Sequence, residues 1–148
     1  MSTTINVRRD DLTVGLTTQN VTLEIASGGL VPLVADLSLN AGEALSALRA
    51  VTSDSNGDAV YASNDTLANS QVIGVTETAA SSGASVAIRT SGLMTDASWS
   101  WTKGTVYLGT NGALTQTVPT GGAFIVHVAR ALTATTIQID IDTTIQTV

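Results

Sequence analysis

Apolar and polar residues alternate in short runs from the beginning of the chain. The first alternating apolar positions are Ile5 and Val7, then Leu12, Val14 and Leu16, and then Val21, Leu23 and Ile25. Successive side chains of a β-strand point to opposite faces, so an apolar residue at every second position is typical of a half-buried strand. The pattern therefore predicts short strands from the first residues onward.

The same alternation, interrupted by turn-forming residues, continues along the rest of the chain. Further strands are predicted over residues 72–75, 85–90, 105–108, 123–131, 136–141 and 145–148. The predicted turns between them are Ser81-Ser82-Gly83, Ser91-Gly92, Lys103-Gly104, Asn111-Gly112 and Pro119-Thr120-Gly121-Gly122. Glycine, asparagine, serine and proline favour turns through positive φ angles, local hydrogen bonds or a restricted backbone. Many short strands at this spacing indicate an all-β sandwich or barrel.

Residues 43–52 allow two interpretations. The segment is rich in alanine and leucine, which are strong helix formers. Asn56-Gly57 then lies at the centre of a predicted tight turn, and residues 59–62 form its return strand. A hairpin needs a strand on both sides of its turn, so we favour a strand over a helix.

The alternation is broken at Gly28-Gly29, and Pro32 lies inside the next apolar run. Proline cannot donate a ladder hydrogen bond, so this run suits an edge strand or a connector. We predict that residues 1–28 form an extended N-terminal arm and that residues 29–148 form the core. A chain of 148 residues has the size of one compact domain, so the core is predicted to be a single small β-sandwich or barrel.

The composition agrees with strands and argues against several functions. Only 12% of the residues are charged, and threonine and serine are abundant. The net charge is −6 with only six lysines and arginines, so no basic patch for nucleic acid can form. The absence of cysteine excludes disulfides, thiolate nucleophiles and cysteine zinc sites. The first eleven residues lack an apolar run, so we expect neither a signal peptide nor a membrane partner. We expect the protein to be made in the cytoplasm.

The single histidine, His127, lies in a predicted strand. Alternation places Phe124, Val126 and Val128 on one face and His127 on the other, together with Ile125 and Ala129. A general-base histidine needs a nucleophile and an orienting group nearby, and no nucleophile motif is present. We therefore interpret His127 as a residue of a subunit contact and predict no catalytic residues.

Asp54-x-Asn56-x-Asp58, followed by Asp65, weakly resembles a calcium-binding loop, in which oxygen ligands occupy alternate positions. Ala59 stands where that loop needs glycine, and Ala62 offers no side-chain oxygen. An ordinary asparagine-glycine hairpin explains the same residues, so we predict no metal site and no cofactor.

Trp99 and Trp101 are separated by one residue, so both rings fall on one face of an extended segment. Such a pair can stack on a sugar or on a neighbouring subunit. Large aromatic side chains are usually buried somewhere, and aromatic residues form only 3% of the chain. We favour a role in the core or at a subunit interface over ligand binding.

The charged residues of the predicted strands fall into two groups. Asp140 and Asp142 alternate with Ile139 and Ile141, which predicts a strand with carboxylates on its outer face. The two aspartates are also the only plausible acid and base if the chain is a glycan hydrolase. A solvated strand edge is the simpler interpretation. Arginines placed among apolar strand residues are expected to form specific ion pairs, and they are Arg49, Arg89 and Arg130.

From about Asn40 onward, strand and turn motifs follow in a recognisable order. They are Ala41-Gly42-Glu43, Leu48-Arg49-Ala50-Val51, Asn56-Gly57-Asp58-Ala59-Val60-Tyr61-Ala62, Val72-Ile73-Gly74-Val75-Thr76, Ser82-Gly83-Ala84-Ser85-Val86, Thr90-Ser91-Gly92, Trp101-x-x-Gly104-x-Val106-Tyr107-Leu108-Gly109, Asn111-Gly112-Ala113-Leu114-Thr115-Gln116 and Val128-Ala129-Arg130-Ala131-Leu132. This order resembles small β-modules of tailed-bacteriophage virion proteins, including capsid decoration (cement) proteins and parts of head or tail fibres. The resemblance covers roughly the last two-thirds of the chain.

The resemblance implies a non-enzymatic structural protein on the capsid surface of a virion. Such proteins are usually homotrimers that bind an assembled shell, so the implied partner is the major capsid protein. The interface residues expected are Ile5, Val7, Leu12 and Val14 in the arm and Trp99, Trp101 and His127 in the core. The alternatives are a head or tail fibre, spike or baseplate module that binds a host surface, with the two tryptophans on a saccharide, and, less favoured, a glycan hydrolase.

Overall fold

The computed structural model describes residues 11–12, 25–26, 35–120, 124–142 and 145–146. Every regular element in these ranges is a β-strand, which confirms the predicted all-β class. The strands are β1 (Asp11–Leu12), β2 (Ile25–Ala26), β3 (Ala35–Asn40), β4 (Ala50–Ser53), β5 (Ala59–Tyr61), β6 (Gly74–Thr76), β7 (Ser85–Thr95), β8 (Gly104–Leu108), β9 (Leu114–Thr115), β10 (Phe124–Ile125), β11 (His127–Ala131), β12 (Thr136–Ile139) and β13 (Ile145–Gln146).

The chain divides into two compact units, Met1–Val31 and Pro32–Val148. In the first unit β1 pairs with β2 in antiparallel fashion, with Asp11 opposite Ala26 and Leu12 opposite Ile25. The predicted boundary near Gly29 lies outside the described residues. The extent of the arm therefore stays a prediction.

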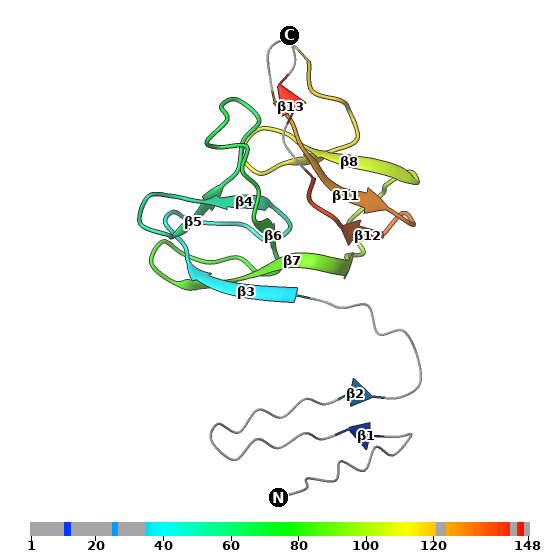
Figure 1. Cartoon of the computed structure of the whole chain (residues 1–148), viewed down its shortest axis with the longest axis horizontal. Helices are drawn as coiled ribbons and strands as arrows, with labels where there is room; N and C mark the ends of the chain where they lie inside the picture. Colours follow the sequence, from blue (N-terminus) through cyan, green and yellow to red (C-terminus); the bar gives the residue numbers. More distant parts are fainter. Residues whose placement is uncertain (1–10, 13–24, 27–34, 121–123, 143–144, 147–148) are drawn as a thin grey trace, which may run out of the picture. The chain divides into compact units, whose positions relative to one another are not determined.

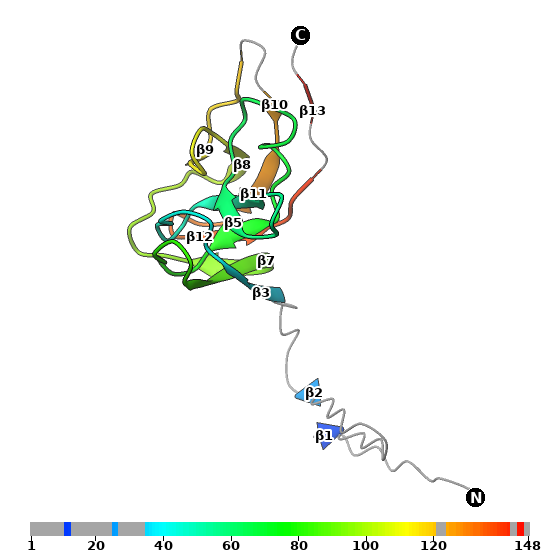
Figure 2. The same cartoon turned by 90° about the vertical axis from the view of Figure 1, so that its left-hand side faces the viewer.

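The second unit is built on one curled antiparallel sheet. Its strands follow the order β5-β4-β6-β7-β12-β11-β8-β9, and β3 also pairs with β7. A separate short ladder joins β10 to β13. Figure 1 shows β3 beside β7, with β4, β5 and β6 near one half of β7 and β12, β11 and β8 near the other half. Figure 2 shows from the side that these strands curve around a common interior.

The long strand β7 connects the two halves of this sheet. Its first half pairs with β3 and β6, and its last four residues pair with β12. Gly92 is the first of these four residues, and it has a φ angle of 94°. Glycine tolerates this conformation without steric cost, so the strand and its ladder continue through residue 92. The predicted turn at Ser91-Gly92 is therefore wrong.

Buried apolar side chains form two clusters, one beneath each half of β7. The first cluster contains Ala50, Ala62, Val75, Met94, Val106, Leu108, Val126, Val128, Ala129, Ala131, Ile137 and Ile139. The second contains Ala41, Leu45, Val51, Ala59, Val86 and Ile88. Full burial of one valine or isoleucine contributes about 1.5–3 kcal/mol, so these alternating strand positions hold the sheet in its curled form.

The predicted hairpin between residues 50 and 62 is confirmed, with Thr52 opposite Val60. In its turn Gly57 has a φ angle of 86° and donates its N–H to the Asp54 carbonyl at 3.1 Å. The predicted strand before it begins only at Ala50, and no helix forms over residues 43–49. Leu48 has a φ angle of 61°, which is incompatible with an extended strand.

A bulge changes the predicted alternation around His127. The pairing of β11 with β8 shifts register between His127 and Ala129, so Val128 and Ala129 are both fully buried. A bulge places two consecutive residues opposite one on the partner strand. The prediction that Ala129 points outward with His127 is therefore wrong, whereas Val126 and Val128 face the core as predicted.

Candidate functional site

The two tryptophans lie in the loop that connects β7 to β8. The loop is fixed by backbone hydrogen bonds from Trp101 N–H to the Ala134 carbonyl, at 2.9 Å, and from Asp96 N–H to the Thr135 carbonyl, at 2.9 Å. The Asp96 carboxylate accepts the Ser98 hydroxyl at 2.5 Å and the Ser98 N–H at 2.8 Å. These two hydrogen bonds, the hydroxyl first, hold the pKa of Asp96 below its ordinary value.

The tryptophan rings contact each other and the core. Their centroids are 6.0 Å apart and their planes are tilted by 54°, a favourable aromatic geometry. Both rings pack against the first core cluster while part of each side chain stays exposed. Nε1 of Trp101 is buried and has no hydrogen-bond partner among the described residues. The expected packing on the core is thus observed, and the expected subunit contact stays a prediction.

Trp99, Trp101 and Leu114 separate two open surface grooves, and we call these three residues the tryptophan ridge. The first groove has a volume of about 410 Å³, and it is also lined by Ser98, Ser100, Thr115 and Gln116. The second has a volume of about 360 Å³, and it is also lined by Ala47, Leu48, Arg49 and Ala113. Three loops that are distant in the sequence therefore meet at the ridge.

The loop that carries Leu48 and Arg49 is held by a buried threonine. The Thr76 hydroxyl accepts the Arg49 N–H at 3.0 Å and lies 2.8 Å from the Ser46 carbonyl, to which it donates. The Thr76 carbonyl accepts the Leu48 N–H at 2.8 Å. A positive φ angle at leucine is an unfavourable conformation that persists only where the surroundings impose it. Thr76 supplies this constraint.

The second loop, between β8 and β9, packs closely on the first. Asn111 and Gly112 have φ angles of 50° and 67°, and the Gly112 carbonyl accepts the Ala50 N–H at 2.9 Å. A Cβ atom at Gly112 would lie 2.5 Å from the Ala50 carbonyl oxygen and 3.2 Å from the Arg49 Cβ. Only glycine allows this approach, so the conformation of the Arg49 segment depends on it.

The third loop is the β7–β8 loop that carries the tryptophans, and Gln116, which lines the first groove, holds it in place. Oε1 of Gln116 accepts the N–H and the hydroxyl of Thr102, each at 3.0 Å, and Nε2 of Gln116 donates to the Thr102 carbonyl at 2.6 Å. These bonds fix the segment that follows Trp101 against the strand that carries Leu114. All three walls of the ridge are therefore rigidly held.

The three arginines predicted to form ion pairs differ. Arg89 contacts Asp36 with an Nε–Oδ1 distance of 3.2 Å and also contacts Glu77, and its Nη1 donates to the Leu93 carbonyl at 2.6 Å. The prediction is confirmed for Arg89. Arg49 and Arg130 are exposed and form no salt bridge with another described residue, so a specific ion pair of either one stays a prediction. Arg49 lies in the loop before β4 and Arg130 lies on β11, and both side chains are at the surface, where side-chain entropy and water weaken an ion pair.

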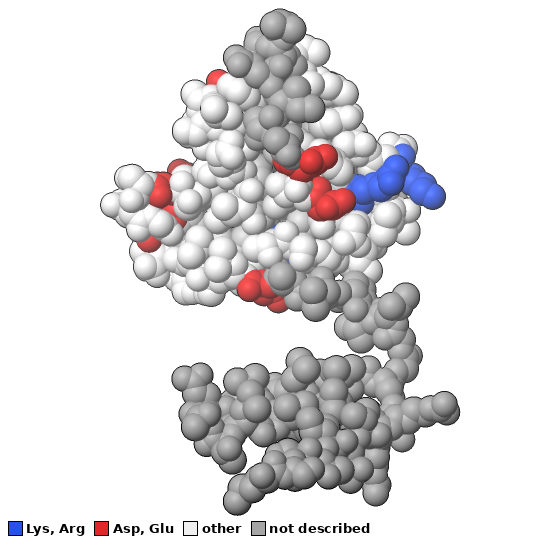
Figure 3. All heavy atoms as spheres, in the orientation of Figure 1, with Lys and Arg blue, Asp and Glu red and all other residues white. Residues whose placement is uncertain are grey.

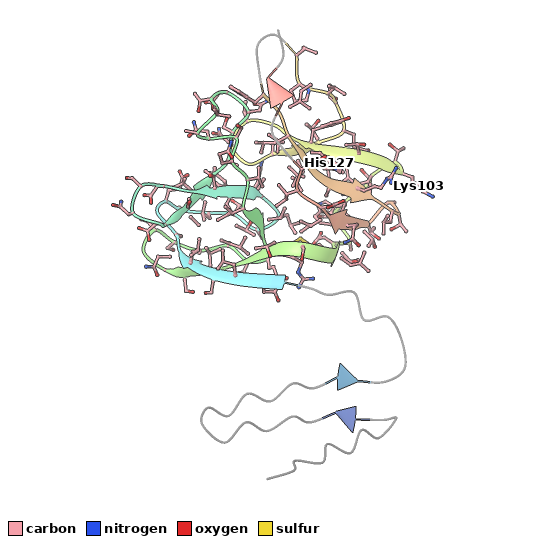
Figure 4. All side chains as sticks on the ribbon, in the orientation of Figure 1. Lys103 and His127 are labelled. Atoms are coloured by element: carbon pink, nitrogen blue, oxygen red, sulfur yellow. The ribbon has the colours of Figure 1, made fainter. Side chains whose placement is uncertain are left out.

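The other predicted interface residues lie elsewhere. His127 is half-buried on β11, opposite Tyr107 of β8, and Figure 4 shows it away from the exposed Lys103. Ile5, Val7 and Val14 are outside the described residues. Leu12 is described only as part of the β1–β2 ladder. Their role in an interface stays a prediction.

The acidic residues have local partners or face solvent. Asp54 accepts the N–H groups of Asn56 and Asp58 at 2.8 and 2.9 Å, and the Asp58 N–H contributes most to its lowered pKa. The side chains of Asp140 and Asp142 are exposed, while Ile139 is buried and Ile141 is half-buried against the first core cluster, so the predicted alternation is correct. Figure 3 shows the acidic side chains of one face in separate small groups on a mostly uncharged surface.

Two further features are absent from the described ranges. No three histidine, aspartate or glutamate side chains there are grouped as metal ligands would be. No helix long and apolar enough to cross a membrane occurs there.

The sequence pattern indicates the tryptophans, but it indicates neither Leu114 nor the residues that hold the loops around the ridge. No local signal marks Thr76, Leu114 or Gln116, because their contacts join segments far apart in the chain. Asn111-Gly112 is predictable as a turn, but not as the turn that supports Arg49.

No protein-family model, curated protein or solved structure matches the chain. The fold and the two grooves together define a small all-β protein with the tryptophan ridge between two surface grooves.

Proposed function

We propose that the chain is a structural protein of a tailed-bacteriophage virion, namely a decoration protein that binds the mature head shell. Its partner is the major capsid protein, and it acts as a homotrimer at the capsid surface without a cofactor or catalysis. The observation that carries this proposal is the division of the chain into an all-β core and an N-terminal unit that contains paired strands.

The sequence of the first unit supports strand addition. Its alternating apolar residues leave one polar and one apolar face, and its backbone can pair with a strand of a neighbouring protein. Main-chain hydrogen bonds of this kind provide affinity while demanding little of the side chains. In this proposal Ile5, Val7, Leu12 and Val14 contact the shell.

A free edge of the core sheet supports assembly into trimers. Among the described strands, β3 pairs only with β7, whereas the outer edge of β5 is already bonded to residues 41–43. The free edge of β3 can accept a further strand unless it is covered. Leu37, on β3, is 38% exposed, which is unusual for a leucine opposite the fully buried Ile88. A neighbouring subunit over this edge would cover the leucine.

A fibre, spike or baseplate module is the second candidate, and the two grooves beside the tryptophan ridge favour it. A module that binds a host surface needs a rigid exposed site, and the ridge is one.

Quantitative mass spectrometry of purified virions tests the proposal. We expect a copy number similar to that of the major shell protein. A few copies per particle would instead assign the chain to a fibre, spike or baseplate, and absence from particles would refute both.

A truncated chain tests the role of the first unit. Removal of residues 1–31 is expected to abolish binding to assembled shells while the core keeps its strand content by circular dichroism. Undiminished shell binding by the truncated chain would contradict the proposed role.

A further inference from the structure

The second groove places one unpaired cation beside two indole rings. Arg49 lines this groove together with Trp99 and Trp101, and its guanidinium forms no salt bridge with another described residue. We infer that the tryptophan ridge and Arg49 bind a saccharide that carries an anionic group. This inference does not rest on the virion assignment, because the groove is a property of the core alone.

The ridge suits a sugar ring. A pyranose presents apolar C–H groups on one face and hydroxyls around its rim, and partly exposed indoles offer a matching apolar surface. The hydroxyls of Ser98, Ser100 and Thr115 line the first groove on the other side of the ridge. One ring against the indoles would thus have hydroxyl partners within the adjoining groove.

The charge distribution indicates an anionic ligand. The chain has twelve acidic residues and a net charge of −6, which repels anions in general. Among the described residues, no aspartate or glutamate lines either groove, and Arg49 is the only charged residue that does. A guanidinium binds a carboxylate or a phosphate through two parallel hydrogen bonds, so either anion fits this position.

The backbone conformation of the site supports the same inference. Leu48 keeps its φ angle of 61° through hydrogen bonds to Thr76, and Gly112 packs against the Arg49 side chain. Unfavourable conformations of this kind are found most often where a binding site needs a fixed geometry. A guanidinium on a rigid segment loses less entropy when it binds, which raises affinity.

Intrinsic fluorescence measures binding at this site directly, because the two tryptophans of the chain both belong to the ridge. Short oligomers of galacturonic acid serve as the carboxylate probe, a phosphorylated mannan fragment as the phosphate probe, and the methyl-esterified galacturonic oligomer as the neutral match. We expect a saturable change in emission with at least one anionic probe, and about tenfold weaker binding of the neutral oligomer.

The variant Arg49→Gln is expected to weaken binding of the anionic probe about tenfold and to leave the neutral oligomer unaffected. Arg130→Gln is the matched control, since Arg130 is also exposed and unpaired among the described residues but lines neither groove. Unchanged circular dichroism confirms that both variants fold.

Three results would overturn the inference. The first is unchanged emission with every saccharide up to roughly 10 mM, a range that covers weak sites. The second is an equal effect of Arg49→Gln and Arg130→Gln. The third is binding of an oligoglutamate peptide as tight as that of the sugar acids, which would make the groove an acidic-peptide site. None of these results depends on whether the protein occurs in virions.

Discussion

The regions around Arg89 and Arg49 use the same side chain in opposite ways. Arg89 projects from the central strand β7, is only 20% exposed, and contacts carboxylates from the β3 side and from the residue after β6. Arg49 lies in a strained loop and has no such partner among the described residues. The first arginine joins strands, whereas the second leaves its charge available at the surface. An arginine that is paired within the fold, such as Arg89, stabilises the structure, whereas an exposed arginine such as Arg49 has its charge available for a ligand.

The close approach of β6 to β7 beside Arg89 gives the largest expected effect. A Cβ atom at Gly74 would lie 2.5 Å from both the Arg89 carbonyl oxygen and the Ile88 Cγ2. Gly74→Ala is therefore expected to lower the free energy of unfolding by about 3 kcal/mol or more. Urea denaturation measures this change.

Gly83→Ala is the control for Gly74→Ala. Gly83 has a φ angle of 81°, and a Cβ atom there would have no other atom within 4 Å, so alanine meets only conformational strain. The expected loss is about 1 kcal/mol. Equal losses at Gly74 and Gly83 would show that the two strands can separate easily.

Loss of the Thr76 hydroxyl is expected to affect the Arg49 region next. Thr76→Val keeps the side-chain shape but leaves the Arg49 N–H and the Ser46 carbonyl without their partner. Unfolding free energy is expected to fall by about 1–3 kcal/mol, with a change in tryptophan emission because Leu48 and Arg49 line the groove. Unchanged emission would mean that the loop keeps its conformation without Thr76.

Neutral replacements of the two arginines test the comparison itself. Arg89→Gln leaves Asp36 and Glu77 near each other without their shared cation, and the expected loss is about 1–2 kcal/mol for a partly exposed network. Arg49→Gln is expected to change stability by less than about 0.5 kcal/mol. Thermal unfolding of both variants side by side measures the difference, and similar losses would show that the two arginines contribute alike to the fold.

The smallest expected effect concerns pH and the Asp96 turn. The hydrogen bonds from Ser98 lower the pKa of Asp96 in the folded state below the ordinary value of 3.8. They therefore stabilise the fold fully at a pH above 3.8, and this stabilisation is lost as the pH falls through the lowered pKa. Ser98→Ala is expected to raise the pKa of Asp96. NMR titration of the carboxyl carbons measures it, with Asp65, whose pKa is lowered chiefly by Asn69, as the unaffected reference.

Much of the fold could be predicted from local patterns. The alternation of Ile137, Gln138 and Ile139 and the turn at Gly57 each depend on neighbours within a few residues, and both predictions are correct. The predictions that are wrong concern single residues whose conformation or burial depends on the neighbouring strand. β7 continues through Gly92 instead of ending in a turn there, and the bulge after His127 buries Ala129. Both depend on which strand lies alongside, which no local pattern contains.

The amino-acid sequence by itself determined the all-β class, the hairpin at Asn56-Gly57 and the inward faces of the later strands, because side-chain alternation and turn chemistry act over short distances. Only the tertiary structure decided that Arg89 is paired, that Arg49 has no salt bridge with another described residue, and that Leu48, Leu114 and Gln116 lie beside the tryptophans. Those contacts join the loop before β4, the β7–β8 loop and the segment around β9. These segments are far apart in the sequence, and long-range packing of the curled sheet brings them together.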